Sequence, residues 1–201
     1  LRTLIGALAH EGVVRWKEGV RIGYVPQRID LERTLPLTVS DFLMTRVRAL
    51  DIHKNVLGEA LGRVRLGKEF LQKKLGSISA GQLQRVLIAF ALIGDPTVLL
   101  FDEPTAGVDL PREEQIYDTL HRLQDEKKFT LLLVSHDLSL VYRYATSVLC
   151  INGRLICYGA PHHVLTEENL HHLYGDRVLY HHYHEDGNHH EEHNHHGEHH
   201  R

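Results

Sequence analysis

The amino-acid sequence predicts an α/β fold with a mostly parallel sheet covered by helices. Two short apolar runs, Thr97–Phe101 and Thr130–Val134, have the composition of strands that are buried on both faces. Between them, residues 112–126 form a charged amphipathic segment with the period of a helix. Strands that alternate with helices are typical of a sheet with crossover connections. The 42% hydrophobic content is enough to form a core around such a sheet.

The N-terminal segment has the pattern of a helix without a beginning. Its apolar residues recur with helical spacing at Leu1, Leu4, Ile5 and Leu8. No capping residue precedes them, and the first residue is Leu rather than Met. We therefore expect the chain to start inside a helix and to be truncated at its N-terminus.

The remaining elements follow in order along the chain. A strand is expected at 21–26, then a mainly helical region at about 30–84 that ends near the glycine-containing segment 76–81. An apolar run at 82–93 predicts a well-buried helix. Beyond the two buried strands, the segments Ser147–Ile151 and Leu155–Tyr158 flank Asn152-Gly153, which is the strongest short signal for a β-hairpin.

Composition excludes several classes of protein. With 23 basic and 26 acidic residues the net charge is −3, which argues against a strongly basic nucleic-acid-binding protein. The longest apolar run, Val86–Ile93, is far shorter than the roughly 20 residues that span a bilayer. Two cysteines, Cys150 and Cys157, cannot form a disulfide framework, so the sequence gives no support for an oxidising compartment. Seven residues apart, they could be metal ligands, but small buried side chains within strands are the favoured interpretation. A soluble, cytoplasmic protein is expected.

Polar landmarks occur in a fixed order along the chain. Gln27 follows a predicted strand, Ser79–Gln82 opens a predicted helix, Asp102–Glu103 ends a strand, and His136 follows another strand. In this order and spacing they resemble the Q-loop, signature motif, Walker B motif and H-loop of the ATP-binding subunits of ABC transporters, over about residues 1–175. Asp109 lies where this family has its D-loop. Five stretches are most similar to the zinc-uptake branch: residues 21–27, 34–39, 84–87, 102–109 and 132–141.

This resemblance implies an ABC-type nucleotide-binding domain, which is a P-loop NTPase-like, mostly parallel sheet with an inserted helical subdomain at about 30–84. The domain is expected to occupy residues 1–178. In the family, this helical subdomain contacts the membrane permease, and the Q-loop residue, here Gln27, links it to the nucleotide.

Two neighbouring carboxylates end the predicted strand at 97–101. Ligands of α/β proteins bind at the carboxyl edge of the sheet, where these side chains would lie. One carboxylate there can hold Mg²⁺ through water, and the next can take a proton from an attacking water molecule. By resemblance, Asp102 is the Mg²⁺ residue and Glu103 the general base. Gln27 would reach the Mg²⁺ or the attacking water.

The signature segment combines a hydroxyl with backbone N–H groups at a helix start, which suits an anion. The resemblance implies that Ser79, Gly81 and Gln82 face the γ-phosphate held by the other subunit of a head-to-tail dimer. Ala80 stands where the family has its first glycine, so the approach of the phosphate is expected to be altered rather than lost. His136 would donate to the γ-phosphate.

The phosphate-binding loop G-x-x-x-x-G-K-[ST] is absent from this sequence. In the family it lies just before a helix that resembles Leu1–Leu8, so the P-loop and the strands before it are expected to be missing from this chain. The chain alone is then expected to bind ATP poorly and to be inactive. Its sheet is expected to expose apolar faces next to the missing strand.

The last residues form a separate segment of unusual composition. Ten of the 21 residues from His181 to Arg201 are histidine, mixed with acidic residues, asparagine and glycine. Because such a segment cannot bury a core, we expect a disordered tail at 179–201. Neutral imidazoles bind Zn²⁺, Cu²⁺ and Ni²⁺. The candidate ligands of such an ion are His189, His190, His193, His195, His196, His199 and His200.

Taken together, these observations predict an ATP-hydrolysing subunit that uses ATP and Mg²⁺ to drive import of a transition metal. Zinc is the metal that the resemblance favours. The partners of the subunit would be a second copy of it, an integral membrane permease and, indirectly, a metal-binding solute receptor. It would therefore lie at the inner face of the cell membrane, and no nucleic acid is expected as a partner.

Three other functions stay open at this point. Manganese or iron import would use the same ATPase, since the ATP site does not select the metal. A non-catalytic regulatory or metal-buffering protein could be built on a disabled ATPase core. A DNA-repair or chromosome ATPase is disfavoured, because only 52 positions separate Gln27 from Ser79, without sustained heptads for a coiled coil.

Overall fold

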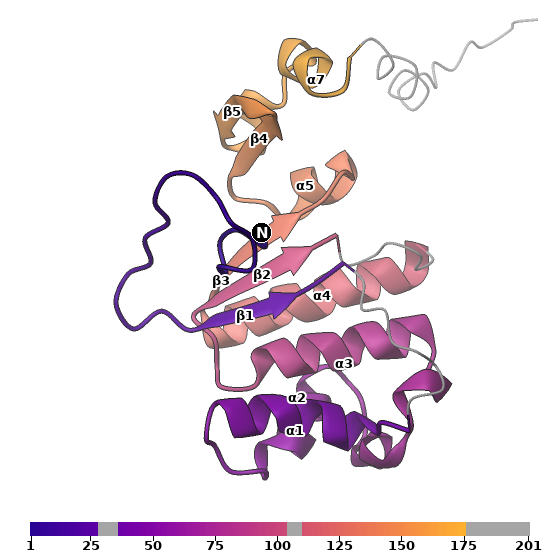
Figure 1. Cartoon of the computed structure of the whole chain (residues 1–201). Helices are drawn as coiled ribbons and strands as arrows, with labels where there is room; N and C mark the ends of the chain where they lie inside the picture. The colour runs from indigo at the N-terminus through magenta and orange to yellow at the C-terminus, as the bar shows by residue number, and fades with distance from the viewer. Residues whose placement is uncertain (28–35, 104–109, 176–201) are drawn as a thin grey trace, which may run out of the picture. The chain divides into compact units, whose positions relative to one another are not determined.

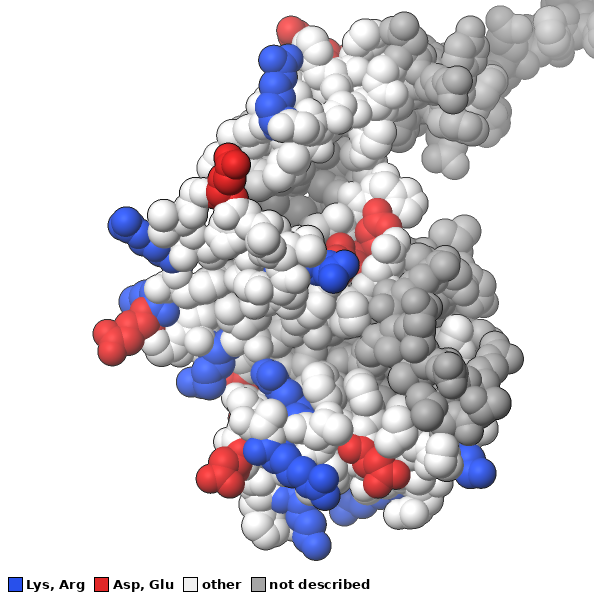
Figure 2. Space-filling model, viewed as in Figure 1, with Lys and Arg blue, Asp and Glu red and all other residues white. Residues whose placement is uncertain are grey.

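The computed structural model describes residues 1–27, 36–103 and 110–175. The chain forms two compact units, one from Leu1 to Asp137 and one from Leu138 onward. Figure 1 shows the first unit as a parallel sheet with helices packed below it. Side chains of both signs are interspersed on the face shown in Figure 2, in keeping with the small net charge of −3.

The sheet of the first unit has three parallel strands. They are β1 (Ile22–Val25), β2 (Val98–Asp102) and β3 (Thr130–Val134), in the spatial order β1-β2-β3. Ile22 of β1 is opposite Val98 of β2, which is opposite Thr130 of β3. Because parallel strands need crossover connections, long helical segments separate them in sequence. The predicted α/β class is confirmed.

Burial differs sharply between β2 and β3. Leu99, Leu100 and Phe101 of β2 are fully buried, as the sequence predicts. The prediction that β3 is buried is wrong, since Leu132 and Val134 are 37% and 39% exposed. Among the described residues β3 pairs with β2 alone, so it forms an edge of the sheet.

Helices fill the long connections between the strands. Between β1 and β2 lie α1 (Val39–Ala49), α2 (Val56–Arg63), the 3₁₀ helices η1 (Lys68–Gln72) and η2 (Leu75–Ser77), and α3 (Ala80–Leu92); α4 (Leu110–Lys127) precedes β3. The predicted helical region therefore exists in its described part. Among the described residues no helix combines the length and the apolar character needed to cross a membrane.

A reciprocal capping box begins α1. The Thr38 hydroxyl accepts a hydrogen bond from the Asp41 backbone N–H at 3.1 Å, while the Thr38 backbone N–H donates to the Asp41 carboxylate at 3.0 Å. Hydrogen bonds from Thr38 lower the pKa of Asp41. Thr38 and Asp41 thereby fix where this helix starts.

One arginine joins α1 to the sheet. Arg46 donates from Nη2 to the backbone carbonyl of Ile22, at the start of β1, over 3.0 Å. Its guanidinium lies 6.0 Å from the centre of the Phe90 ring, which stacks on Phe42 at 4.7 Å. Burial lowers the pKa of Arg46. A partly buried polar contact therefore links the helical region to the first strand.

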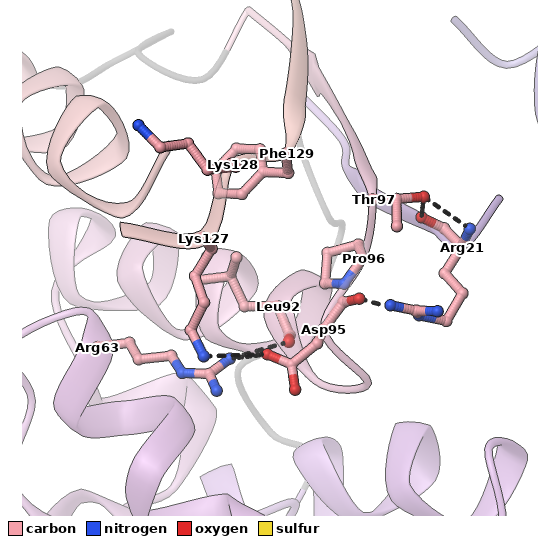
Figure 3. A pocket seen from close by; sticks show the side chains of 9 residues that line it. All are labelled: Arg21, Arg63, Leu92, Asp95, Pro96, Thr97, Lys127, Lys128 and Phe129. Atoms are coloured by element: carbon pink, nitrogen blue, oxygen red, sulfur yellow. Dashed lines mark hydrogen bonds and ion pairs between the residues drawn. The ribbon is translucent and has the colours of Figure 1, made fainter. Parts of the chain in front are cut away.

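The amino ends of the strands meet a network of basic residues around Asp95 (Figure 3). Arg63 at the end of α2 lies 3.0 Å from the Asp95 carboxylate, and Lys127 at the end of α4 lies 3.6 Å from it. Arg21 donates to the Asp95 carbonyl at 3.0 Å. Since α2, α3 and α4 all end here, cations also complement the negative ends of their dipoles. This network fixes the end of the sheet that lies away from the polar landmarks.

The first eight residues do not form the helix that their spacing predicts. They form hydrogen-bonded turns, with Leu4 N–H donating to the Leu1 carbonyl at 2.9 Å and Gly6 N–H to the Thr3 carbonyl at 3.0 Å. Gly6 has φ +73°, which lies outside the helical region. A segment this short, without a capping residue, cannot nucleate a stable helix by itself.

The second unit is a hairpin packed with helices. It contains α5 (Leu138–Tyr144), β4 (Val148–Asn152), β5 (Arg154–Gly159), α6 (Pro161–Val164) and α7 (Glu167–Tyr174). The antiparallel hairpin turns at Asn152-Gly153, as predicted. Cys150 and Cys157 are opposite each other and are buried, as expected, but they are joined by a disulfide, which the sequence analysis does not anticipate.

Two glycines test the packing of this fold in opposite directions. A Cβ on Gly23 of β1 would lie 2.5 Å from the Ala91 carbonyl oxygen and 2.9 Å from Leu99 Cδ1. We expect Gly23→Ala to lower the free energy of unfolding by about 1–3 kcal/mol, because it overpacks the contact between β1 and α3. On α2, a Cβ on Gly62 would meet nothing within 4 Å. There Gly62→Ala should raise stability by about 0.5–1 kcal/mol. Urea denaturation measures both, and equal effects would contradict the packing.

Candidate active site

Four predicted site residues of the first unit lie at or just after the carboxyl ends of its three strands. Gln27 comes two residues after β1, Asp102 ends β2 and Glu103 follows it, and His136 comes two residues after β3. All three strands run in the same direction (Figure 1), so their carboxyl ends lie at one edge of the sheet. The topology therefore places these side chains at the edge where α/β proteins bind ligands.

Glu103 is the centre of a three-residue cluster at this edge. The side-chain amide of Gln27 donates a hydrogen bond to Oε2 of Glu103. On the other side, His136 Nδ1 lies 3.4 Å from Oε1 of Glu103. The Glu103 side chain is 31% exposed and His136 is 78% exposed, so the carboxylate remains accessible to water. The structure thus brings together three residues that are far apart in sequence.

The backbone of Glu103 adopts an unusual conformation. Its φ is +37°, which is positive for a residue with a side chain. Such conformations cost about 1–3 kcal/mol and persist only where the surroundings enforce them. The Glu103 N–H donates to the Val134 carbonyl at 3.1 Å, which ties the end of β2 to the end of β3. The carboxylate is therefore held by both its backbone and its neighbours.

Asp102 has a separate partner that sequence reasoning missed. The Tyr24 hydroxyl donates to Oδ2 of Asp102 at 3.3 Å. Burial raises the pKa of Tyr24, and the charge of Asp102 and this hydrogen bond raise it further. The sequence does show a tyrosine within a mostly apolar strand, and the hydroxyl of such a tyrosine needs a hydrogen-bond partner. It does not show which residue is the partner, because that residue lies on another strand.

The signature segment forms a complete capping box at the start of α3. The Ser79 hydroxyl accepts from the Gln82 N–H at 3.3 Å, and the Ser79 N–H donates to the Gln82 side-chain carbonyl at 3.0 Å. Gly81 lies in the first turn of this helix. These contacts are the ordinary capping arrangement, and the exposed helix start keeps its positive dipole end toward solvent.

Several predicted site residues lie outside the described part of the chain. Asp109 is one of them. The others are the tail histidines: His189, His190, His193, His195, His196, His199 and His200.

The carboxyl edge offers ligand atoms that suit Mg²⁺ without forming a complete site. Asp102 supplies carboxylate oxygens and Gln27 an amide oxygen, which are the hard donors that this ion prefers. Within residues 1–27, 36–103 and 110–175, no three His, Cys, Asp or Glu side chains gather to hold a metal ion. Mg²⁺ at phosphate-transfer sites keeps several waters and binds substrate phosphates, so few protein ligands are needed.

Known proteins are similar to this chain in sequence. The family model of the ABC transporter matches residues 5–106, which include Gln27, the signature segment and Glu103. The chain belongs to the ABC transporter family. It is 35% identical to the zinc import ATP-binding protein ZnuC of Mannheimia succiniciproducens, over 89% of the chain and 69% of that protein. Identity to the ZnuC proteins of Brucella melitensis and Yersinia enterocolitica is 39%, over 87% and 92% of the chain.

Solved structures of ABC transporters have the same fold. A metal-chelate type ABC transporter in an inward-facing conformation matches with a TM-score of 0.75 and 26% identity, over 86% of this chain and 70% of that chain. CbiO1 from Clostridium perfringens, part of the ABC transporter complex cbiONQ, matches with a TM-score of 0.60 and 27% identity, over 79% of this chain and 64% of that chain. The chain spans 59% and 74% of the Brucella and Yersinia ZnuC proteins.

The capping box of α3 predicts a stability effect at the signature segment. Ser79→Ala removes the hydroxyl that accepts from the Gln82 N–H, so the free energy of unfolding should fall by about 0.5–2 kcal/mol. Thr45→Ala is the control, since the Thr45 hydroxyl donates to the Phe42 carbonyl inside α1 and alanine favours the helix. Urea denaturation compares the two. A loss of stability at Thr45 as large as at Ser79 would contradict the capping role.

Proposed function

We propose that this protein is the ATP-binding and ATP-hydrolysing subunit of an ABC importer for a transition metal, with zinc as the cargo. The observation that carries the proposal is the cluster of Gln27, Glu103 and His136, which gathers a general base and two polar partners at the ligand-binding edge of the sheet. The names of the three ZnuC relatives support zinc over manganese or iron.

In this proposal Glu103 takes a proton from the water that attacks the γ-phosphate. Its carboxylate is accessible and is oriented from two sides, as a general base requires. Gln27 holds one carboxylate oxygen and fixes its direction. The His136 side chain is 78% exposed, so its ring can turn to donate a hydrogen bond to the γ-phosphate.

Asp102 and Gln27 would hold Mg²⁺, which, when bound, neutralises charge on the β- and γ-phosphates. Glu103 then stays free for proton transfer. This division of labour agrees with the separate partners of the two carboxylates, since Asp102 is held by Tyr24 and Glu103 by Gln27 and His136.

The proposed assembly contains two copies of the subunit and a membrane permease. In a head-to-tail dimer, Ser79, Gly81 and Gln82 would present the positive start of α3 to the γ-phosphate held by the other copy. Asp109 would lie at this interface. The helical region with α1 and α2 would contact the permease at the inner face of the membrane, and a metal-binding receptor would deliver the cargo. Residues 1–178 would form the ATPase domain.

The central prediction concerns Glu103. In an intact subunit that carries a phosphate-binding loop, Glu103→Gln should keep ATP binding and slow hydrolysis by about 10²–10⁴-fold, because the amide cannot accept the proton. Steady-state phosphate release and equilibrium binding of an ATP analogue measure the two effects. Glu126→Gln on α4 is the control, since this exposed side chain pairs with Arg122. Normal turnover in the Glu103 variant would refute the general-base assignment. Absence of ATP hydrolysis by the intact wild-type subunit would instead favour a regulatory protein on a disabled ATPase core.

A second proposed activity belongs to the histidine-rich tail, residues 179–201. The density of histidine supports binding of Zn²⁺ as a buffer, a sensor or a handover site. A tail peptide should take up Zn²⁺ at pH 7.5, and its affinity should fall steeply towards pH 5, because protons compete for imidazoles with a pKa of about 6.5. Calorimetric titration measures this. A peptide with asparagine at all tail histidines is the control, and equal or pH-independent uptake would remove the idea.

A further inference from the structure

The register of the sheet places Tyr24 within hydrogen-bonding reach of Asp102. In the pairing of β1 with β2, Tyr24 is opposite Leu100. Side chains alternate along a strand, so Leu100 and Asp102 lie on the same face as Tyr24. Asp102 is two residues, about 6.6 Å, further along β2. A tyrosine is long enough to cover this distance, and its hydroxyl lies 3.3 Å from Oδ2 of Asp102.

The second carboxylate at the end of β2, that of Glu103, has a different donor. Glu103, one residue beyond Asp102, receives its hydrogen bond from Gln27, which is three residues beyond Tyr24. β1 and the residues that follow it therefore supply one donor to each of the two carboxylates at the carboxyl end of β2. The two donors use different chemistry, a phenol for the metal-side carboxylate and an amide for the base.

We infer that Tyr24 is a positioning residue that orients the Asp102 carboxylate for Mg²⁺. This inference rests on the proposed function and deepens it. The hydrogen bond occupies Oδ2 and leaves Oδ1 to face the ion or one of its waters. Groups that hydrogen-bond to a metal ligand fix its rotamer, and their loss typically costs about 10–100-fold in metal affinity.

A partly buried environment makes this contact effective. Tyr24 and Asp102 are both half-buried. The neighbouring residues Gly23 and Val25 are buried, and they hold the backbone of β1 against α3 and β2. A hydrogen bond between a rigid strand and a carboxylate loses little side-chain entropy, so it can select one orientation of Asp102.

The test compares two tyrosines that each lose one hydrogen-bonded hydroxyl. In the intact subunit, Tyr24→Phe should weaken Mn²⁺ binding in the presence of a non-hydrolysable ATP analogue by about tenfold, and should leave analogue binding without metal unchanged. Electron paramagnetic resonance of free Mn²⁺ measures this without any turnover. Tyr142→Phe is the control, because the Tyr142 hydroxyl donates to the Leu165 carbonyl in the second unit. It should bind Mn²⁺ as the wild type does.

A double-mutant cycle shows whether Tyr24 acts through Asp102. Asp102→Ala removes the acceptor of the Tyr24 hydroxyl and should itself weaken Mn²⁺ binding, and adding Tyr24→Phe should then have no further effect. Unchanged Mn²⁺ affinity in Tyr24→Phe, or the same loss in the Asp102→Ala background, would overturn the inference while the proposed function stands. A wild-type subunit that binds no Mn²⁺ with the analogue would overturn the proposed function, and the inference with it.

Discussion

Parallel pairing of β2 with a strand on each side is the constraint on which the candidate site depends. Because β1, β2 and β3 run in the same direction, the residues that follow them meet at one edge. Glu103 can touch both Gln27 and His136 only because its strand is the middle one. The backbone bond from Glu103 to Val134 and the contact of Tyr24 with Asp102 are further products of the same register.

Much of this arrangement could be predicted from local patterns. The continuous apolar run before Asp102 predicts the buried β2, and Asn152-Gly153 predicts the hairpin. The positions of Gln27, Glu103 and His136 after strands predict that they converge, since parallel strands share an edge. The first two features depend only on the residues within a short segment. The third depends only on the strands running in the same direction.

Features that depend on distant neighbours could not be predicted in the same way. An apolar strand has the same sequence whether it is central or at an edge, so the exposure of Leu132 in β3 was missed. The spacing from Leu1 to Leu8 is helical, but nucleation of so short a helix is unfavourable, and the Leu4 carbonyl accepts a hydrogen bond from the Trp16 indole N–H. The disulfide and the partner of Tyr24 both follow from strand register, which the sequence does not encode at any single position.

The contact of Arg46 with Ile22 has a mechanical consequence. It ties α1 to the strand that ends just before Gln27, and the ring of Phe42 on α1 stacks on Phe90 of α3. A displacement of α1 is therefore expected to move β1 with it. Gln27 follows β1 by two residues and donates to Glu103, so the carboxylate cluster would receive part of that displacement.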